Sequence, residues 1–288
     1  DIAERDALAL SLNVPVVALT DALGPDRLMA ALRGFGVTPR LPGDAAPGLA
    51  VALGGVGVSL KDLVTLYAGL AQGGQARPLH VLGGQGKGVA AVLAPRAAWQ
   101  VGDILADIPP PPRARAGLAY KTGTSYGHRD AWAGGFDGRQ GGGGWIGRPD
   151  GTPVPGAFGG DHAAPLLFEV FGRLKPDYDP LPPPPPDTLI VTQAQLPQHL
   201  RRFGDSGAGA GGPVVAFPPD GAVLAAPDTV LKIRGGRLPL TVLVNGAPIE
   251  VQQRSRQIAL GPLGPGFSDI AVIDAQGQSA HVTVQARP

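Results

Sequence analysis

The sequence predicts an α/β (α+β) domain, with helices packed on an antiparallel sheet, followed by a small all-β sandwich-like domain. Three observations predict this organisation. Helix signals dominate the first third of the chain, and strand-forming runs follow them. Residues 182–186 are five consecutive prolines, which form a stiff spacer. In the last quarter, short apolar runs alternate with turn residues. The expected boundaries are a first domain over 1–174, a Pro/Gly-rich linker over 175–212 and a second domain over 213–288.

Five helices are expected before the central strand, and one after the sheet. Acidic residues gather at the start of the first helix, and Pro15 opens the second, where a helix tolerates proline. Ser59 and Asp62 are spaced almost as in a capping box, and Tyr67 lies on the apolar face of the helix that follows, which favours a role in core packing. A weak hairpin is expected over 75–94. The expected helices are 1–10, one opened by Pro15, 24–36, 60–73, 95–108 and 161–174.

The central strand is expected at residues 118–125, and it ends in a polar turn. Residues 131–136 and 145–149 then predict two further strands of the same sheet. Between them lie four consecutive glycines, 141–144, which weaken a strand because glycine has the largest backbone entropy and no side chain to pack. The sequence alone offers no physical reason for this tetraglycine.

The C-terminal part consists of short apolar runs separated by turn signals such as Asn245-Gly246 and Gln276-Gly277. Short strands at regular spacing are typical of a small β-sandwich. No catalytic cluster of side chains is apparent in this part. The expected strands are 214–217, 230–233, 240–244, 249–252, 258–260, 269–273 and 281–285.

Composition excludes several classes of function. The formal net charge of +1 gives no electrostatic case for nucleic-acid binding. The chain has no Cys, which excludes disulfides, thiol nucleophiles and thiolate metal sites. Its five His residues lack metal-ligand spacing, so we expect no metal and no cofactor. No apolar run has membrane-spanning length, and the chain starts at Asp1 inside an expected helix, so we expect a piece of a longer protein.

The central strand carries the chemically most informative motif, Lys121-Thr122-Gly123 followed by Thr124 and Ser125. A substrate with a terminal carboxylate needs a cation and a hydroxyl side by side, and Lys121 and Thr122 supply them. Gly123 has no side chain, so another backbone can approach closely. A peptide could then join the strand edge as an additional strand. Lys-Thr-Gly is also one of the motifs of penicillin-binding proteins and class A β-lactamases.

A second motif, Ser11-x-Asn13, lies just before Pro15. Two interpretations remain open from the residues alone. Ser11 or Asn13 could cap the second helix, since both residue types accept hydrogen bonds from the first backbone N–H groups of a helix. Alternatively, the two side chains belong to a catalytic site. Taken by itself, the motif favours the cap.

Taken together, the motifs resemble the transpeptidase domain of class A penicillin-binding proteins, the 1C type in particular. The resemblance is carried by residues 8–15, 120–127, 129–132 and 147–153. The β-rich tail resembles the C-terminal domain that follows the transpeptidase in those bifunctional enzymes. The likeness covers nearly the whole chain and is looser between residues 75 and 95.

The resemblance implies a role for each motif residue. In that family a serine of a Ser-x-x-Lys motif attacks the penultimate D-Ala carbonyl of a stem peptide, and the acyl group then passes to an amine of another strand. Ser11 matches the hydroxyl that relays protons to the leaving group, and Asn13 matches the amide that hydrogen-bonds the substrate and the motif lysine. Lys121 and Thr122 match the groups that hold the terminal carboxylate. The Thr124 N–H matches an oxyanion-hole donor, a contribution on the order of 3 kcal/mol. The expected catalytic residues are Ser11, Asn13 and Lys121, and the expected substrate-binding residues are Thr122, Gly123, Thr124 and Ser125.

The chain departs from the family pattern in one decisive respect. None of its seven Ser residues is followed by Lys at the third position, so both the nucleophile and its lysine are missing. We expect them upstream of Asp1, with the glycosyltransferase domain and the membrane anchor further upstream. The fragment alone is therefore expected to be inactive. The tetraglycine 141–144 is a second departure, in a strand expected to be apolar.

Two alternatives stay open. A D,D-carboxypeptidase or serine β-lactamase relative shares the motifs, although the β-rich tail and the run 126–132 argue against it. A non-catalytic peptidoglycan- or partner-binding module is the other, with the β domain as its working part.

The resemblance also implies partners and a location. The expected partners are peptidoglycan stem peptides and β-lactams, with other cell-wall synthesis proteins contacting the C-terminal β domain. No nucleic-acid partner is expected, and membrane contact is expected only through the upstream anchor. The implied location is the periplasmic side of the bacterial inner membrane.

Overall fold

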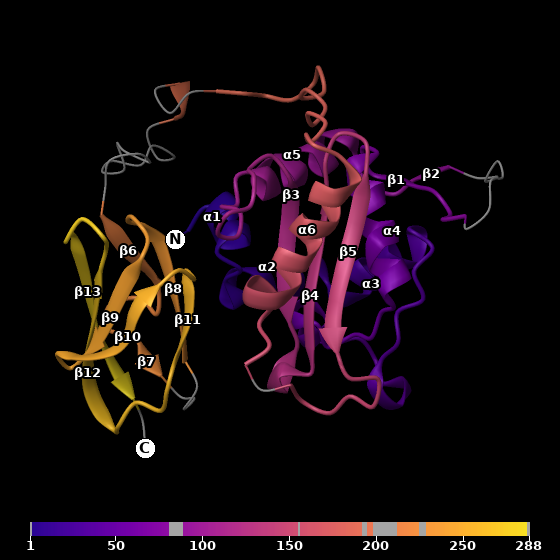
Figure 1. Ribbon diagram of the computed structural model, residues 1–288. Coiled ribbons are helices and arrows are strands. Elements are labelled where there is room, and N and C mark those ends of the chain that lie inside the picture. Colours follow the sequence, from indigo (N-terminus) through magenta and orange to yellow (C-terminus); the bar gives the residue numbers. More distant parts are fainter. Residues whose placement is uncertain are drawn as a thin grey trace. The chain divides into compact units, whose positions relative to one another are not determined.

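The computed structural model of the chain describes residues 2–80, 89–154, 156–191, 195–197, 212–224 and 229–286. The chain forms two compact units, Asp1–Thr188 and Leu189–Pro288. Each unit has its own sheets (Figure 1). Each also has its own cluster of buried hydrophobic residues. The mixed helix-and-strand character of the first unit and the all-β character of the second confirm the predicted fold class.

A three-stranded antiparallel sheet forms the centre of the first unit. Its strands are β3 (Ala119–Thr124), β4 (Asp130–Phe136) and β5 (Gly141–Gly147), in the order β3-β4-β5. Helix α6 (Ala164–Leu174) packs on one face, and helix α4 (Leu60–Ala71) packs on the other (Figure 1). Because β4 is the central strand, β3 lies at an edge of this sheet.

The remaining elements of the first unit surround this sheet. Helix α4 begins with the expected capping box, in which Ser59 Oγ accepts from the Asp62 N–H at 3.1 Å and Asp62 accepts from the Ser59 N–H at 3.2 Å. A π-helical turn, η4 (Gly159–Ala163), leads into α6 where the sequence predicts one continuous helix. The other elements are α1 (Glu4–Ala9), α2 (Asn13–Leu23), α3 (Pro25–Gly34), α5 (Pro95–Ala106), the short pair β1 (Gln75–Ala76) and β2 (Ala90–Ala91), and the 3-10 turns η1 (Pro42–Asp44), η2 (Leu49–Leu53) and η3 (Tyr126–His128).

The tetraglycine lies inside β5, which therefore begins four residues earlier than the predicted strand. Its position between two helices explains the missing side chains. A Cβ on Gly143 would lie 2.9 Å from Val64 of α4, and a Cβ on Gly142 would lie 3.1 Å from the Phe171 ring of α6. Strand β4 has a similar close contact between a helix side chain and a glycine, because a Cβ on Gly134 would overlap the Tyr67 ring. Glycine allows both helices to pack directly on the backbone of the sheet.

Segment 175–188, the first part of the predicted linker, belongs to the first unit instead. Tyr178 packs its ring against Phe168 and Phe171, and Trp99 Nε1 donates to the Pro182 carbonyl at 3.0 Å. These contacts hold the proline-rich stretch against the helices. The sequence missed this because proline content predicts a stiff extended chain but not the surface against which it lies.

Asp137 fastens the same segment to the sheet. It is 1% exposed and accepts hydrogen bonds from the backbone N–H groups of Arg139, Gln140 and Asp179 at 2.8–3.0 Å. Lys175 forms ion pairs with both Asp137 and Asp179. Burial acts to raise the pKa of Asp137, but the hydrogen bonds from Lys175 and from the three N–H groups outweigh it and lower that pKa below its usual value. A buried carboxylate thus joins the turn between β4 and β5 to the chain beyond α6.

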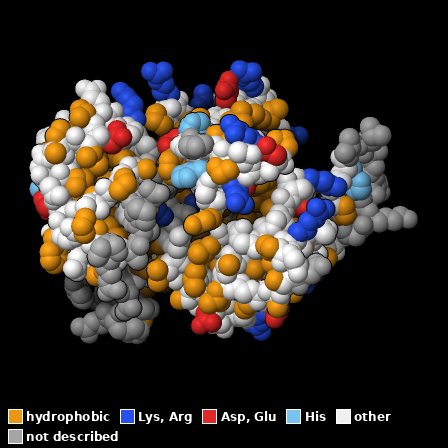
Figure 2. All heavy atoms as spheres, turned by 90° about the horizontal axis from the view of Figure 1, so that it is seen from below, with side chains coloured by type: hydrophobic (Ala, Val, Ile, Leu, Met, Phe, Trp, Pro, Cys, Tyr) orange, Lys and Arg blue, Asp and Glu red, His pale blue; other side chains and the backbone are white. Residues whose placement is uncertain are grey.

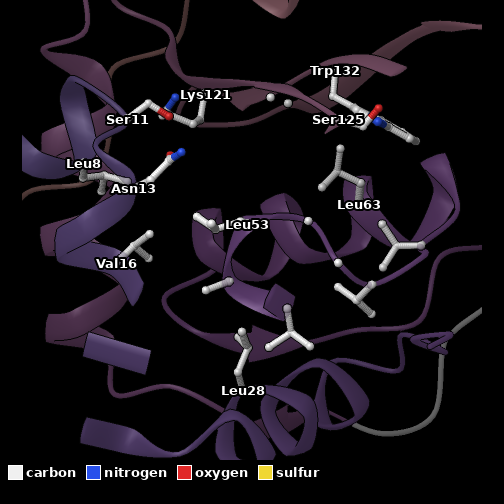
Figure 3. Close-up of a pocket in the computed structure, with 18 of the residues that line it drawn as sticks. Leu8, Ser11, Asn13, Val16, Leu28, Leu53, Leu63, Lys121, Ser125 and Trp132 are labelled. Carbon is white, nitrogen blue, oxygen red and sulfur yellow. The ribbon is translucent and has the colours of Figure 1, made fainter. Parts of the chain in front are cut away.

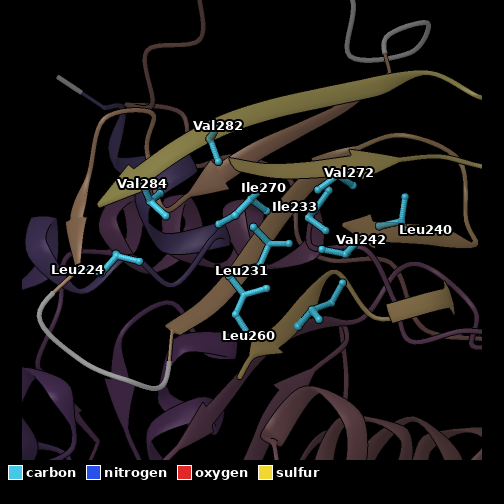
Figure 4. Packing of buried hydrophobic residues seen from close by; sticks show 11 residues of the cluster. Leu224, Leu231, Ile233, Leu240, Val242, Leu260, Ile270, Val272, Val282 and Val284 are labelled. Atoms are coloured by element: carbon cyan, nitrogen blue, oxygen red, sulfur yellow. The ribbon is translucent and has the colours of Figure 1, made fainter. Parts of the chain in front are cut away.

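The second unit is a β-sandwich. A five-stranded sheet of order β10-β9-β12-β13-β7 faces a three-stranded sheet of order β11-β8-β6. The two inner faces bury a cluster that includes Leu231, Val242, Ile270 and Val284 (Figure 4). All seven predicted strands are present, and β7 is an additional short one. The strands are β6 (Pro213–Phe217), β7 (Val223–Leu224), β8 (Thr229–Gly235), β9 (Leu240–Val244), β10 (Ala247–Gln253), β11 (Gln257–Leu260), β12 (Gly266–Ile273) and β13 (Ser279–Ala286).

None of the helices in the described ranges is both long enough and apolar enough to cross a membrane.

The packing of α4 on β5 generates a stability prediction. Gly143→Ala should lower the free energy of unfolding by about 1–3 kcal/mol, because the added methyl group overpacks the contact with Val64. Gly172→Ala is the matched control. It lies in α6 with open space around its Cβ position, so alanine should stabilise the unit by about 0.5–1 kcal/mol. Urea denaturation of both variants measures the two shifts, and equal shifts would contradict the packing explanation.

The Asp137 network generates a second prediction. Asp137→Ala should lower the free energy of unfolding by about 3 kcal/mol, because three backbone N–H groups lose their acceptor and Lys175 loses one of its two carboxylate partners. The exposed carboxylate of Asp21 is the control, and Asp21→Ala should change that energy by less than about 0.5 kcal/mol.

The same network predicts a pH dependence. The folded-state pKa of Asp137 lies below its unfolded value of about 3.9, so the unfolded chain binds more protons between the two values. The stabilisation by Asp137 is therefore present above about pH 4 and is lost as the pH falls through the folded pKa. Asp137→Asn should weaken this loss of stability at acid pH. The urea midpoints of both proteins, measured at several pH values, would show the difference. An equal loss of stability at acid pH in the variant and the wild type would contradict the prediction.

Candidate active site

A cavity of about 1440 Å³ lies within the first unit and collects the predicted site residues (Figure 3). Ser11 and Asn13 line it from the junction of α1 and α2, and residues 121–125 line it from β3. More than one hundred positions separate these two segments in the sequence. The fold therefore brings together all seven residues that the sequence predicts.

Ser11 lies in the turn between α1 and α2 with a backbone φ of +55°, a region that non-glycine residues rarely adopt. The N-cap residue of α2 is Leu12, whose side chain makes no capping hydrogen bond. Neither Ser11 nor Asn13 therefore stands at the N-cap position that the motif favours when taken alone. Figure 3 shows the Ser11 hydroxyl and the Lys121 amine next to each other.

The register of β3 against β4 decides which side chains face the cavity. Lys121 pairs with Gly134 and Gly123 with Trp132, so these residues share the face on which Tyr67 of α4 packs. Ser125 continues the alternation on this face. The N–H of Ser125 donates to β4, so the N–H and C=O groups of Thr122 and Thr124 point toward the open edge of the strand.

Two of the predicted hydroxyl groups have structural partners. Thr124 Oγ1 accepts from the Gly159 N–H at 3.0 Å, and Ser125 Oγ accepts from the Asp130 N–H at 2.8 Å. The Thr124 contact ties the edge strand to the π-helical turn on the opposite face of the sheet. The backbone of Thr124, rather than its hydroxyl, is thus the part directed toward the cavity edge.

The contacts of Lys121 and Gly123 differ from those of the two hydroxyl residues. Lys121 Nζ donates to the Thr122 carbonyl at 3.0 Å, which holds the ammonium along the strand. A Cβ on Gly123 would lie 3.8 Å from the nearest heavy atom, Cβ of Trp132, an ordinary contact. The surrounding protein therefore leaves room for a side chain at position 123, and the space above the strand is open to a ligand.

Tyr67, Asp130 and Trp132 also line the cavity, although the sequence predicts no site role for them. Tyr67 packs against Phe136 with ring centroids 6.5 Å apart, as expected of a core residue, but it also lines the cavity. Burial raises the pKa of Tyr67, so its hydroxyl stays neutral at physiological pH. The signal for Asp130 and Trp132 was present, since both follow the motif strand at positions that a hairpin returns to the same face.

The rest of the cavity is mainly apolar, with Leu and Val side chains from α2, α3, α4 and residues 49–58. Some apolar side chains nearby are exposed, among them Val14 at 77%, Leu23 at 50% and Leu53 at 46%. Figure 2 shows hydrophobic side chains reaching the surface on the face seen there. Nowhere in the described ranges do three or more His, Asp or Glu side chains gather in a way that could hold a metal ion.

Comparisons with known proteins agree with this architecture. Residues 204–284 match the model of the Penicillin-Binding Protein C-terminus Family. Penicillin-binding protein 1C of Escherichia coli (strain K12) is 44% identical over 175 residues, which cover 59% of this chain and 23% of that protein. Penicillin-binding protein 1B of Vibrio cholerae serotype O1 is 32% identical over 167 residues, which cover 51% of this chain and 21% of that protein. The chain thus spans less than a quarter of the length of either relative.

Among solved structures, the crystal structure of penicillin-binding protein 1A from Haemophilus influenzae matches 63% of this chain and 36% of that chain. The TM-score is 0.50 and the sequence identity is 17%, so the likeness is one of fold. The chain is therefore similar to penicillin-binding protein 1C, with an α/β N-terminal part that resembles penicillin-binding protein 1A and an all-β C-terminal part that matches the Penicillin-Binding Protein C-terminus Family.

Proposed function

We propose that this chain is the C-terminal part of a bifunctional peptidoglycan synthase and carries most of a penicillin-sensitive D,D-transpeptidase site. The observation that supports it best is the shared cavity. Ser11, Asn13 and the strand from Lys121 to Ser125 line one hollow although they lie far apart in the sequence. Such a convergence is what a reaction that needs a proton relay, a substrate amide partner and a carboxylate anchor requires.

The proposed reaction is acyl transfer. A serine nucleophile attacks the penultimate D-Ala carbonyl of a stem peptide bound along the edge of β3, with Lys121 and Thr122 holding the terminal carboxylate. The Thr124 N–H stabilises the negative charge that develops on the carbonyl oxygen. Ser11 passes a proton to the departing D-Ala amine, and Asn13 hydrogen-bonds the peptide. An amine of a second strand then takes the acyl group, which restores the serine and forms the cross-link.

The nucleophile must come from outside these 288 residues, because no Ser here is followed by Lys at the third position. The cavity supports this. Its volume of about 1440 Å³ exceeds the roughly 300–1,000 Å³ of ordinary ligand sites. We propose that the Ser-x-x-Lys segment occupies the apolar part of the hollow between α2 and α4, which leaves the β3 edge for the peptide.

The second unit has a separate proposed role. Its described part holds no group of acidic and His side chains that could bind a metal ion, and residues 204–284 match a C-terminal family of penicillin-binding proteins. We propose that it contacts peptidoglycan or another cell-wall synthesis protein. The relatives support a location in the cell envelope, and we propose the periplasmic side of the inner membrane.

Labelling with a fluorescent penicillin tests the proposed function. The 288-residue chain would be compared with the same chain joined to its upstream sequence through the next Ser-x-x-Lys. Label on the extended protein alone is the expected result. Label on neither would contradict the transpeptidase proposal and favour a binding module. Label on the short chain would contradict the assignment of the nucleophile, with Ser11 the first residue to replace.

Lys121→Ala in the extended protein should reduce the rate constant of penicillin acylation by at least about 100-fold, because the carboxylate loses its cationic anchor beside the reacting carbonyl. Lys61→Ala is the matched control, since Lys61 is exposed on α4 and does not line the cavity. Stopped-flow acylation measures both rates. A rate for Lys121→Ala equal to that of the control would remove Lys121 from the proposed site.

A further inference from the structure

The position opposite Lys121 on β4 has no side chain of its own, and Tyr67 of α4 fills it. Lys121 and Gly134 are direct partners in the register of β3 and β4. Side chains of such a pair lie on one face of the sheet, with Cβ atoms about 4.5–5.5 Å apart. A Cβ on Gly134 would overlap Cε2 of Tyr67 and would lie 2.8 Å from its Cζ. The Tyr67 ring therefore takes the place of the missing side chain and becomes the cross-strand neighbour of Lys121.

The surroundings of Lys121 on this face are unequal on its two sides. The adjacent positions on its own strand are Ala119 and Gly123, which are small. On the β4 side stand the rings of Tyr67 and Phe136, whose centroids lie 6.5 Å apart. An aromatic wall thus flanks Lys121 toward β4, whereas no bulky side chain flanks it along β3.

The Lys121 ammonium lies away from this wall. Its Nζ donates to the Thr122 carbonyl at 3.0 Å, and that carbonyl points toward the open edge of β3. Figure 3 shows the amine next to the Ser11 hydroxyl. A lysine side chain loses much rotamer freedom when it holds one position. A ring on the β4 side excludes the conformers in which the ammonium folds back over the sheet, because these conformers would overlap the ring.

Helix α4 holds the ring through two contacts that lie one turn apart. Val64 packs on Gly143 much as Tyr67 packs on Gly134, since a Cβ on Gly143 would lie 2.9 Å from Val64 Cγ2. The two glycines are direct partners in the register of β4 and β5. Residues three apart share one face of a helix, so both side chains press on the sheet together. Tyr67 lines the cavity, whereas Val64 does not.

We propose that Tyr67 is a positioning residue whose ring keeps the Lys121 ammonium at the open edge of β3, beside Ser11. The inference rests on the proposed function, in which Lys121 binds the terminal carboxylate of the substrate. Ring atoms, rather than the hydroxyl, occupy the space over Gly134. A phenylalanine at position 67 would therefore serve equally well, and an aliphatic side chain would not.

The test uses the chain joined to its upstream Ser-x-x-Lys segment and two forms of one fluorescent penicillin, the free carboxylate and its methyl ester. The ester keeps the reactive β-lactam ring but lacks the charge that Lys121 binds. For each variant, the rate constant of labelling is measured with both forms. The readout is the rate constant of the carboxylate divided by that of the ester, so a general loss of activity cancels.

Tyr67→Leu should lower this ratio by about tenfold, because a misplaced ammonium stabilises the bound carboxylate less well in the transition state. Tyr67→Phe should keep the wild-type ratio. Val64→Ala is the matched control, since it loosens the same packing of α4 on the sheet outside the cavity lining, and it should also keep the ratio. When Lys121 is already alanine, Tyr67→Leu should change the ratio by less than about twofold, because the group that the ring positions is gone.

The outcomes separate this inference from the proposed function. Wild-type protein that takes no label would overturn the proposed function, and equal rates with the two forms would overturn its assignment of Lys121. A wild-type ratio in Tyr67→Leu, an equal decrease in Val64→Ala, or a decrease in Tyr67→Phe as large as that in Tyr67→Leu would overturn the inference alone. If Tyr67→Leu fails to fold, Tyr67→Met decides by the same criteria, because methionine fills irregular space without a flat ring.

Discussion

The direct packing of α4 and α6 on the glycine positions of the central sheet is the contact on which the first unit depends. Tyr67 and Val64 rest on the backbone of Gly134 and Gly143, and Phe171 rests on Gly142 from the other face. Because α4 lies this close, its side chains form a floor under the cavity face of β3. The sheet is thus clamped between two helices while β3 keeps an open edge, and an edge strand held this rigidly can present a row of groups in fixed order.

Much of this fold could be predicted because it depends on local signals. The capping box at Ser59, the helices and the seven strands of the sandwich follow from spacing and turn residues. The tetraglycine strand could not be placed, because a run without side chains carries no periodicity, and its reason lies in helices distant in sequence. The π-helical turn before α6 and the packed proline segment also depend on tertiary contacts that no local pattern encodes.

The sequence likewise predicted one part of the candidate site and not another. The motif Lys121-Thr122-Gly123 indicated a strand edge with a carboxylate anchor, and the structure has that strand at an edge of its sheet. The sequence could not decide between a cap and a catalytic role for Ser11, because that choice depends on the backbone angles of three consecutive residues. Asp130 belongs to the run 129–132 that carries the resemblance, but the sequence predicts no role for it in the site. Its place in the cavity comes from hairpin register, which converts neighbours in sequence into neighbours on one face.

The positive φ of Ser11 lowers the stability of the turn that carries this candidate site residue. A serine with φ near +55° holds a conformation that suits glycine better, at a cost of about 1 kcal/mol or more. Glycine there would relax the turn between α1 and α2 but would remove the hydroxyl that faces Lys121. Position 11 is thus a place where the proposed chemistry and the stability of the turn favour different residues.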